Sequence, residues 1–248
     1  MGAEFYGEDF QGADVAPFVG INTFLHLPWV KNHKELLEAK PDVAIIGEPF
    51  DFGTTIRPGA RYGPRAIRAA STIPSPPFER FNIETGADPF GTFRTVDYGD
   101  VVVSPGDVIG SHKSMTLKVK EVLEADGIPV MLGGDHSITY ANVRAFQKKF
   151  KNIGMIHFDT HADCAPQGLT GFKYDHGAHI RRIMEMGCLK GKNYSLVGPR
   201  GYWPGRDLYK WMSDQDFQWF TMLDVEELGI DYIAKEIADR ANDGTDAV

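Results

Sequence analysis

Two short runs of residues, Gly133–Ser137 and His157–Asp163, each follow an apolar, strand-like stretch and combine aspartate with histidine. The second run carries its Asp, His and Asp at alternate positions, and alternate side chains of an extended chain point to the same side. Carboxylates and imidazoles without thiolates suit a borderline or hard divalent ion such as Mn²⁺ better than a structural zinc. The predicted metal ligands are His136, Asp159, His161 and Asp163.

The pattern favours two ions rather than one. A carboxylate can bridge two ions, and an imidazole between two carboxylates can complete the coordination of one of them. A metal pair of this kind positions and activates one bridging hydroxide. The competing interpretation is that these polar residues only cap turns, which is the usual role of an isolated Gly-Asp-His motif.

Alternating strands and helices must position these side chains. Apolar runs predict strands at 43–47, 95–103, 128–132, 153–158, 194–197 and 219–223, and helical patterns cover residues 64–68, 112–126, 137–150 and 230–241. This alternation predicts a mostly parallel sheet that is covered on both faces. Ligands of such sheets bind at the carboxyl ends of the strands, where both polar runs are found.

The bulk properties exclude several classes of protein. A net charge of −8 over 248 residues argues against non-specific binding of nucleic acid. The two cysteines imply no disulfide framework, the acidic N-terminus is no signal peptide, and no apolar run is long enough to span a bilayer. We therefore expect a soluble, cytoplasmic protein with an N-terminal arm at residues 1–40, one domain at 41–248 and a long loop at 73–94.

From about residue 40 to residue 248, the chain resembles the ureohydrolase superfamily, and within it the agmatinase-like branch. The motifs that carry the resemblance occur in the order of the family: Gly47–Asp51, Arg57–Pro64, Gly133–Ser137, His157–Asp163, Asp175–Gly177 and Val197–Gly201. The resemblance implies a three-layer α/β/α sandwich and the hydrolysis of a guanidino group to urea. It also implies two Mn²⁺ per subunit, with another divalent ion such as Ni²⁺ as an alternative, and a homo-oligomer, either a trimer or a hexamer.

The resemblance also assigns roles to individual residues. It makes the four predicted ligands those of the family, and it gives Asp159 a catalytic role as well. His176 would lie at the substrate and shuttle a proton, and His179 is a weaker candidate for substrate binding. A histidine near its ordinary pKa can protonate the leaving amine, which is worth roughly 10²–10⁴-fold in rate. Agmatine, guanidinobutyrate, guanidinopropionate and guanidine all remain open as substrates.

One family signature is absent from these 248 residues: the Ser-x-Asp-x-Asp run that supplies two further metal carboxylates. Asp224 begins a helix and fits a capping role better, and Asp246 has no acidic partner two residues on. Fewer carboxylates should weaken the second ion most. The C-terminal part of the family's domain is thus expected to be missing, and the alternative function is that of a truncated or degenerate, non-catalytic paralogue in binding or oligomer assembly. Deacetylation of an acylated amine is a second hydrolase alternative, which the motif order disfavours.

Other reactive residues have simpler interpretations. Arg57, Arg61, Arg65 and Arg68 could bind an acidic substrate tail, but ties to nearby carbonyls and carboxylates are the favoured interpretation. Cys164 follows Asp163 directly, yet no histidine–cysteine arrangement supports a thiol nucleophile.

Overall fold

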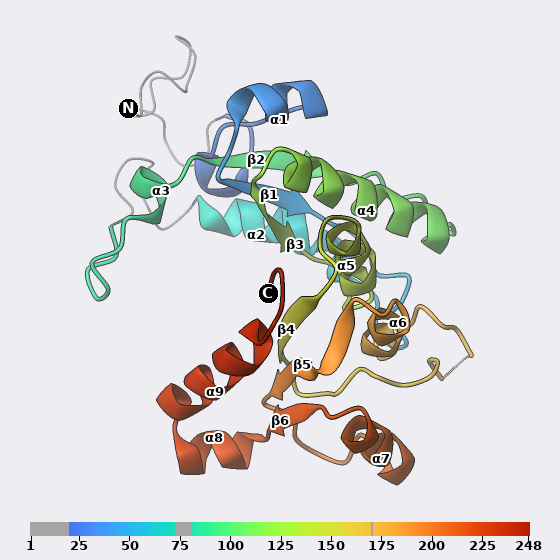
Figure 1. Ribbon diagram of the computed structural model, residues 1–248. Coiled ribbons are helices and arrows are strands. Elements are labelled where there is room, and N and C mark those ends of the chain that lie inside the picture. The colour runs from blue at the N-terminus through green and yellow to red at the C-terminus, as the bar shows by residue number, and fades with distance from the viewer. Residues whose placement is uncertain (1–19, 73–80, 170) are drawn as a thin grey trace. The chain divides into compact units, whose positions relative to one another are not determined.

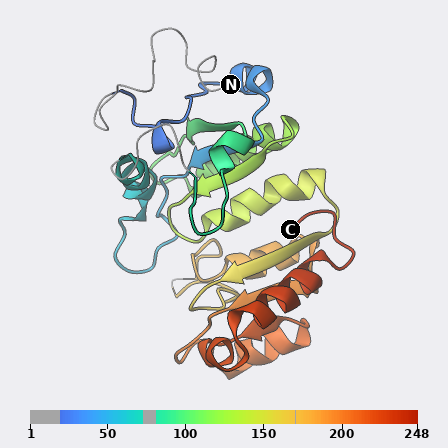
Figure 2. The same cartoon turned by 90° about the vertical axis from the view of Figure 1, so that its left-hand side faces the viewer.

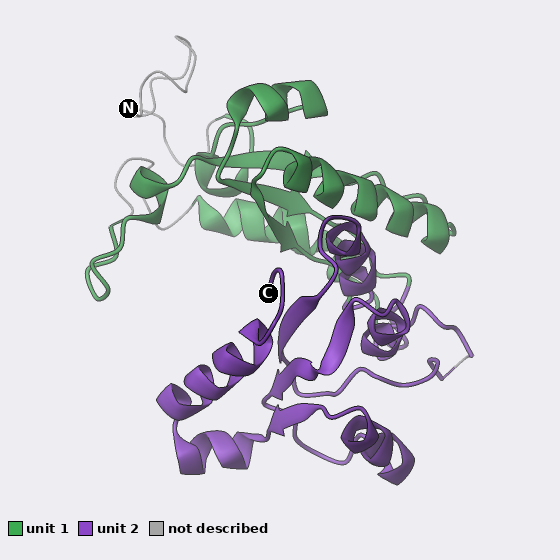
Figure 3. Cartoon of the chain, viewed as in Figure 1, with its two compact units in different colours: residues 1–52, 57–135 green, residues 53–56, 136–248 purple. Residues whose placement is uncertain are grey.

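The structure is a computed structural model, and it describes residues 20–72, 81–169 and 171–248. It separates into two compact units (Figure 3). Unit 1 comprises residues 1–52 and 57–135, and unit 2 comprises residues 53–56 and 136–248. Each unit contains a three-stranded parallel sheet with helices packed against it.

In unit 1 the strand order is β2-β1-β3, with β1 at Val43–Gly47, β2 at Thr95–Asp100 and β3 at Ile128–Leu132. The central strand, β1, is buried along most of its length, as expected for a parallel strand that is covered on both faces. The helices of this unit are α1 at His33–Ala39, α2 at Gly63–Ser71, α3 at Pro89–Thr92 and α4 at Val108–Glu124. Helices α2 and α4 both pack on β3, and α4 also contacts β1 (Figure 1).

In unit 2 the strand order is β4-β5-β6, with β4 at Ile153–Phe158, β5 at Leu189–Val197 and β6 at Gln218–Phe220. The helices are α5 at Ile138–Lys149, α6 at His179–Glu185, α7 at Arg206–Asp214, α8 at Met222–Leu228 and α9 at Ile230–Asn242. Helix α9 lies along β4 and β5 (Figure 2), while α6 packs on β5. Figure 1 shows α9 and α6 on opposite sides of this sheet, so unit 2 is a three-layer α/β/α arrangement.

The amphipathic pattern of α9 shows why this helix docks. Its residues Ile233, Ile237 and Ala241 are at most 4% exposed and lie on one face of the helix at a spacing of four residues. Gly154 of β4 makes the close approach possible, because a Cβ at this position would lie 2.0 Å from the carbonyl oxygen of Ala241. A glycine in the strand therefore fits the helix against the sheet.

The predicted α/β class and the parallel sheets are confirmed. The strand predicted at 219–223 is shorter, because Thr221 and Asp224 form a capping box that starts α8, and this confirms the capping role of Asp224. Helix α1 lies within the predicted N-terminal arm, of which residues 1–19 are outside the described residues. The division into an arm and one domain stays a prediction. No helix among the described residues is long and apolar enough to span a membrane.

Of the predicted loop at 73–94, residues 73–80 are outside the described residues. The remainder contains the short helix α3, which begins at an Asp88 cap, and an isolated bridge between Asn82 and Ala87.

Candidate metal centre

The candidate metal centre is in unit 2, at the carboxyl end of β4 and at the amino end of α5. Asp159 directly follows β4, and its amide donates to the carbonyl oxygen of Val197 at 3.0 Å, which continues the pairing with β5. His136 lies in the turn that leads into α5. The order of elements thus delivers both sequence motifs to one place, as the α/β pattern predicts.

His136 contacts both carboxylates of the centre. Its Nδ1 lies 2.9 Å from Oδ2 of Asp159 and 3.0 Å from Oδ2 of Asp163. Burial opposes the charged imidazolium, but the hydrogen bonds to the two carboxylates outweigh it and raise the pKa of His136 to about 9. For Asp159, burial acts in the opposite direction to the hydrogen bonds from His136 and His157, and the pKa of its carboxyl falls well below the ordinary range. The two carboxylates therefore stabilise a positive charge placed between them.

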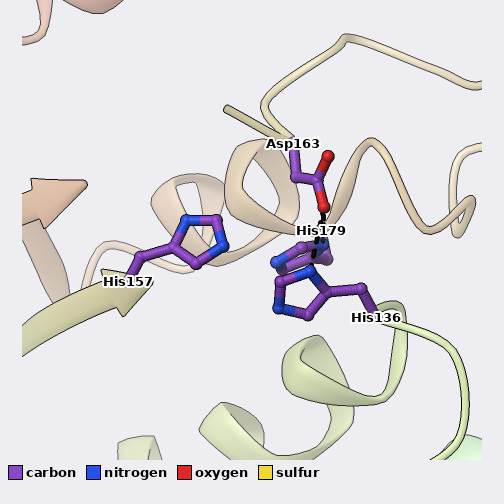
Figure 4. Close-up of side chains that lie close together, drawn as sticks. All are labelled: His136, His157, Asp163 and His179. Atoms are coloured by element: carbon purple, nitrogen blue, oxygen red, sulfur yellow. Dashed lines mark hydrogen bonds and ion pairs between the residues drawn. The ribbon is translucent and has the colours of Figure 1, made fainter. Parts of the chain in front are cut away.

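Two further imidazoles belong to this cluster. His157, on β4, is 4% exposed, and His179, the first residue of α6, is 1% exposed. One nitrogen of each of the three imidazoles and one oxygen of Asp163 lie within 4.8 Å of one another. Figure 4 shows these rings and the carboxylate turned toward one another. Three imidazoles and a carboxylate are a donor set typical of a divalent metal site.

The hydrogen bonds around His179 test whether a cation fits here. Its Nδ1 lies 2.9 Å from the carbonyl oxygen of His176, whereas its Nε2 is buried and has no hydrogen-bond partner. Burial lowers the pKa of His179 well below its ordinary value, so the ring is neutral. A neutral imidazole with a buried, unused nitrogen is the form that binds a metal, and the residues present therefore fit a divalent cation.

His161, the remaining predicted ligand, lies apart from this cluster. Its side chain is 57% exposed, and its Nδ1 is 3.9 Å from Oδ1 of Asp159. The ring of Trp203 packs edge-to-face on it at a centroid distance of 5.8 Å. The extended conformation that would align alternate residues ends with β4 at Phe158, and Asp163 has a left-handed φ of 42°. Asp159 and Asp163 nevertheless meet at His136, and the role of His161 as a ligand stays a prediction.

The other predicted site histidine, His176, lies beside Thr55. Its Nε2 is 3.1 Å from the Thr55 hydroxyl, which also lies 3.0 Å from Oδ2 of the buried Asp175. His176 is partly exposed, so its imidazole is held by neighbours yet can reach a ligand. His179 lies in the histidine cluster, and the substrate-binding role predicted for it stays a prediction. Its position next to the family-like Asp175–Gly177 motif was the only sequence signal for it.

The acidic residues near the end of the chain lie at the opposite, amino end of β4. The Asp246 carboxylate accepts hydrogen bonds from the amides of Lys151 and Asn152, both at 2.9 Å. Asp243 pairs with Lys192 at 2.7 Å. Both carboxylates therefore serve local structure, and neither contributes to the metal cluster.

The simpler interpretations of Arg61, Arg68 and Cys164 agree with the structure. Arg61 pairs with the buried Asp51, and Arg68 binds Asp97 through two nitrogens, at 2.7 and 2.9 Å. These contacts hold the segment that follows β1 in place. Cys164 is fully buried, and burial raises the pKa of its thiol to about 12, so it is not a nucleophile at neutral pH.

Comparison with known proteins places these motifs in a family. The sequence profile described as "Arginase family" matches residues 41–248. The chain is 31% identical to a guanidinobutyrase of Pseudomonas aeruginosa, over 94% of this chain and 71% of that protein. It is 37% identical to a mitochondrial agmatinase of Gallus gallus and 38% identical to a mitochondrial guanidino acid hydrolase of Homo sapiens. Each of these matches covers 82% of this chain, and the chain spans 57% and 55% of the two relatives.

Solved structures share the fold. The proclavaminate amidino hydrolase of Streptomyces clavuligerus superposes with a TM-score of 0.80 at 28% identity, over 92% of this chain and 72% of that one. A formiminoglutamase of Trypanosoma cruzi, solved with Mn²⁺, gives a TM-score of 0.76 at 23% identity, over 89% of this chain and 71% of the other.

Proposed function

The chain belongs to the arginase family, and from this membership and the geometry of its metal cluster we propose that it hydrolyses a guanidino compound to urea and an amine. The observation that carries the proposal is His136 Nδ1 between the carboxylates of Asp159 and Asp163, at 2.9 and 3.0 Å. A guanidinium carbon is a poor electrophile because its charge is shared among three nitrogens. The reaction therefore needs a strong, positioned nucleophile at neutral pH.

Divalent cations supply that chemistry when bound, because they lower the pKa of water and orient it toward the substrate. We propose that His136, Asp159 and Asp163 hold such ions, with His161 as a further ligand once its exposed ring turns inward. Two Mn²⁺ per subunit, or another divalent ion such as Ni²⁺, are the proposed cofactors. The Mn²⁺ in the formiminoglutamase structure supports this choice at the level of the fold.

The proton for the leaving amine is assigned to His176. The Thr55 hydroxyl lies 3.1 Å from its Nε2, and the Asp175 carboxylate lies on the other side of that hydroxyl. These two neighbours hold the imidazole in one orientation. An imidazole can donate a proton near pH 7, and a positioned acid typically contributes roughly 10²–10⁴-fold in rate.

Linear guanidino compounds are the proposed substrates, because the named relatives include an agmatinase, a guanidinobutyrase and a guanidino acid hydrolase. Agmatine, guanidinobutyrate and guanidinopropionate are the first compounds to test. The substrate-binding role of His179, assembly as a trimer or hexamer, and a cytoplasmic location stay predictions.

The proposal is tested by incubating the purified chain with Mn²⁺ and each guanidino compound, and measuring the release of urea. We expect urea from at least one compound, and a loss of roughly 10²–10⁴-fold in kcat for His176→Asn. His33→Asn is the matched control, because His33 is on α1 of unit 1 and pairs only loosely with Glu124, at 3.9 Å. Absence of urea from every compound would contradict the proposal.

A further inference from the structure

The Thr55 hydroxyl lies between the ring of His176 and the buried carboxylate of Asp175, and it has only one proton to donate. We propose that Thr55 is a positioning residue that fixes the tautomer of His176, with the proton on Nε2 and with Nδ1 left as the nitrogen that serves the reaction. This inference deepens the proposed function, on which it rests for the catalytic role of His176. The tautomer itself can be measured without turnover.

The backbone of His176 is held at both of its polar groups. Its amide donates to the carbonyl oxygen of Gly53 at 3.0 Å, and its carbonyl oxygen accepts from Nδ1 of His179 at 2.9 Å. Residues 53–56 belong to unit 2, although 121 positions separate Thr55 from His176. With the backbone fixed, the 3.1 Å contact between the Thr55 hydroxyl and Nε2 orients the ring.

The carboxylate decides the direction of these hydrogen bonds. A hydroxyl carries one proton, and an ionised carboxylate can only accept. Oδ2 of Asp175 lies 3.0 Å from the Thr55 hydroxyl, and Asp175 is buried. Hydrogen bonds to a charged acceptor are roughly twice as strong as those between neutral groups, so the hydroxyl donates to Asp175. A lone pair of the hydroxyl then accepts from Nε2 of His176, which must carry the proton.

The opposite tautomer gives a poorer set of contacts. With the lone pair on Nε2, the hydroxyl would donate to the ring and leave two oxygens, its own and Oδ2 of Asp175, 3.0 Å apart with no proton between them. The Thr55 amide would be a second donor to Nε2, but its nitrogen is 3.5 Å away, at the long end of hydrogen-bond distances. Such a long contact does not compensate for a buried carboxylate oxygen that has lost its donor.

The other oxygen of Asp175 is fixed by the backbone. Oδ1 accepts from the amide of Gly177 at 2.9 Å, so the two carboxylate oxygens have separate donors. An asparagine in this place must present its oxygen to the Gly177 amide, and its NH₂ group then lies at the Thr55 hydroxyl. In Asp175→Asn the hydroxyl therefore accepts from residue 175 and donates to His176, and the hydrogen bonds run in the reverse direction.

Nδ1 is the ring nitrogen of His176 that Thr55 leaves for the substrate. No residue in the described part of the chain forms a hydrogen bond with it, and the side chain is partly exposed. When the C–N bond of the substrate breaks, its electron pair goes to the amine nitrogen, which takes the proton from Nδ1. The ring is left neutral, with its Nε2 proton still donated to Thr55. Because a misplacement of about 1 Å can cost about 100-fold in rate, the contact that orients the ring matters for this step.

The test measures the tautomer of His176 by long-range proton–nitrogen NMR on the metal-free full chain with isotope-labelled histidine. The pH is kept well above the ordinary histidine pKa of about 6.5, and the His176 signals are identified by their loss in His176→Asn. We expect the proton on Nε2 in the unsubstituted chain and in Thr55→Ser, both tautomers in Thr55→Val, and the proton on Nδ1 in Asp175→Asn. Thr245→Val is the matched control, because the Thr245 hydroxyl donates to the carbonyl oxygen of Ala241 at 2.9 Å, and it should leave the tautomer unchanged.

Turnover gives a second readout. With a guanidino compound that releases urea, Thr55→Val should lower kcat by about 100-fold with little change in KM, because the hydroxyl acts through His176 and does not bind the substrate. Thr55→Ser should restore kcat, since it keeps the hydroxyl. A merely structural role of Thr55 would change stability without this split between kcat and KM.

Four results would overturn the inference: a proton on Nδ1 in the unsubstituted chain, an unchanged tautomer in both Thr55→Val and Asp175→Asn, an equal change in Thr245→Val, or equal kcat values for Thr55→Val and Thr55→Ser. The first result decides even if a variant fails to fold, which circular dichroism reports. Absence of urea contradicts the proposed hydrolysis and leaves the tautomer readable. A proton on Nδ1 contradicts only the role of Thr55.

Discussion

Both units have aspartates on or shortly after a strand of their parallel sheet, but these aspartates have different partners. In unit 1, Asp97 on β2 is fully buried and meets the guanidinium of Arg68, which also pairs with Asp100. In unit 2, Asp159 and Asp163 meet imidazoles. A guanidinium stays protonated and fills its site permanently, whereas an imidazole can lose its proton and offer a lone pair. The same kind of carboxylate is therefore structural in unit 1 and available to a metal ion in unit 2.

The largest effect is expected from breaking the pair in unit 1. Arg68→Met leaves the fully buried Asp97 carboxylate without its cation, which should lower the free energy of unfolding by about 3–5 kcal/mol. Urea denaturation of the metal-free chain measures this loss. Arg94→Met is the control, because its contact with Asp42 is exposed and should contribute nothing measurable. Equal losses in the two variants would contradict the structural role of Arg68.

The next effect separates the two units by their response to metal. A ligand present at 100 times its Kd stabilises the folded state by about 2.7 kcal/mol, so Mn²⁺ should raise the Tm of the unsubstituted chain. His136→Ala should abolish this rise, because His136 joins both carboxylates of the cluster. Arg68→Met should start from a lower Tm and keep the full rise. A rise that survives in His136→Ala would show that Mn²⁺ binds elsewhere.

The smallest effect concerns the stability of the fold at acidic pH. The hydrogen bond from Arg61 holds the pKa of the Asp51 carboxyl below its ordinary value, and amides of Gly59 and Arg61 add to this shift. A lowered pKa stabilises the fold above the unfolded value of about 3.9, and this contribution is lost as the pH falls through the folded pKa. Asp51→Asn should therefore flatten the fall in stability below about pH 4, as followed by urea denaturation at a series of pH values. An identical acid profile in the variant would exclude a contribution from this pair.

Local rules predicted the elements of the fold well. The apolar runs that became β1, β3 and β4 and the spacing of α9 depend on residues close together in the sequence. The predicted end of the strand at 219–223 was wrong, because the Thr221 cap starts α8 and overrides the β propensity of the residues that follow. At His161 the extended backbone has already ended with β4, so local rules do not determine where this side chain points.

The sequence by itself determined the α/β class, the two motifs and the prediction that His136 meets Asp159 and Asp163, because each motif directly follows a strand. Only the tertiary structure decided that the rings of His136 and His179, which are far apart in the sequence, would lie side by side. Their ring centroids are 4.1 Å apart. That contact depends on how α6 packs on β5 and on the hydrogen bond that orients the ring. Packing between distant segments leaves no periodic signal in the sequence, and so His179 became visible as a member of the cluster only in three dimensions.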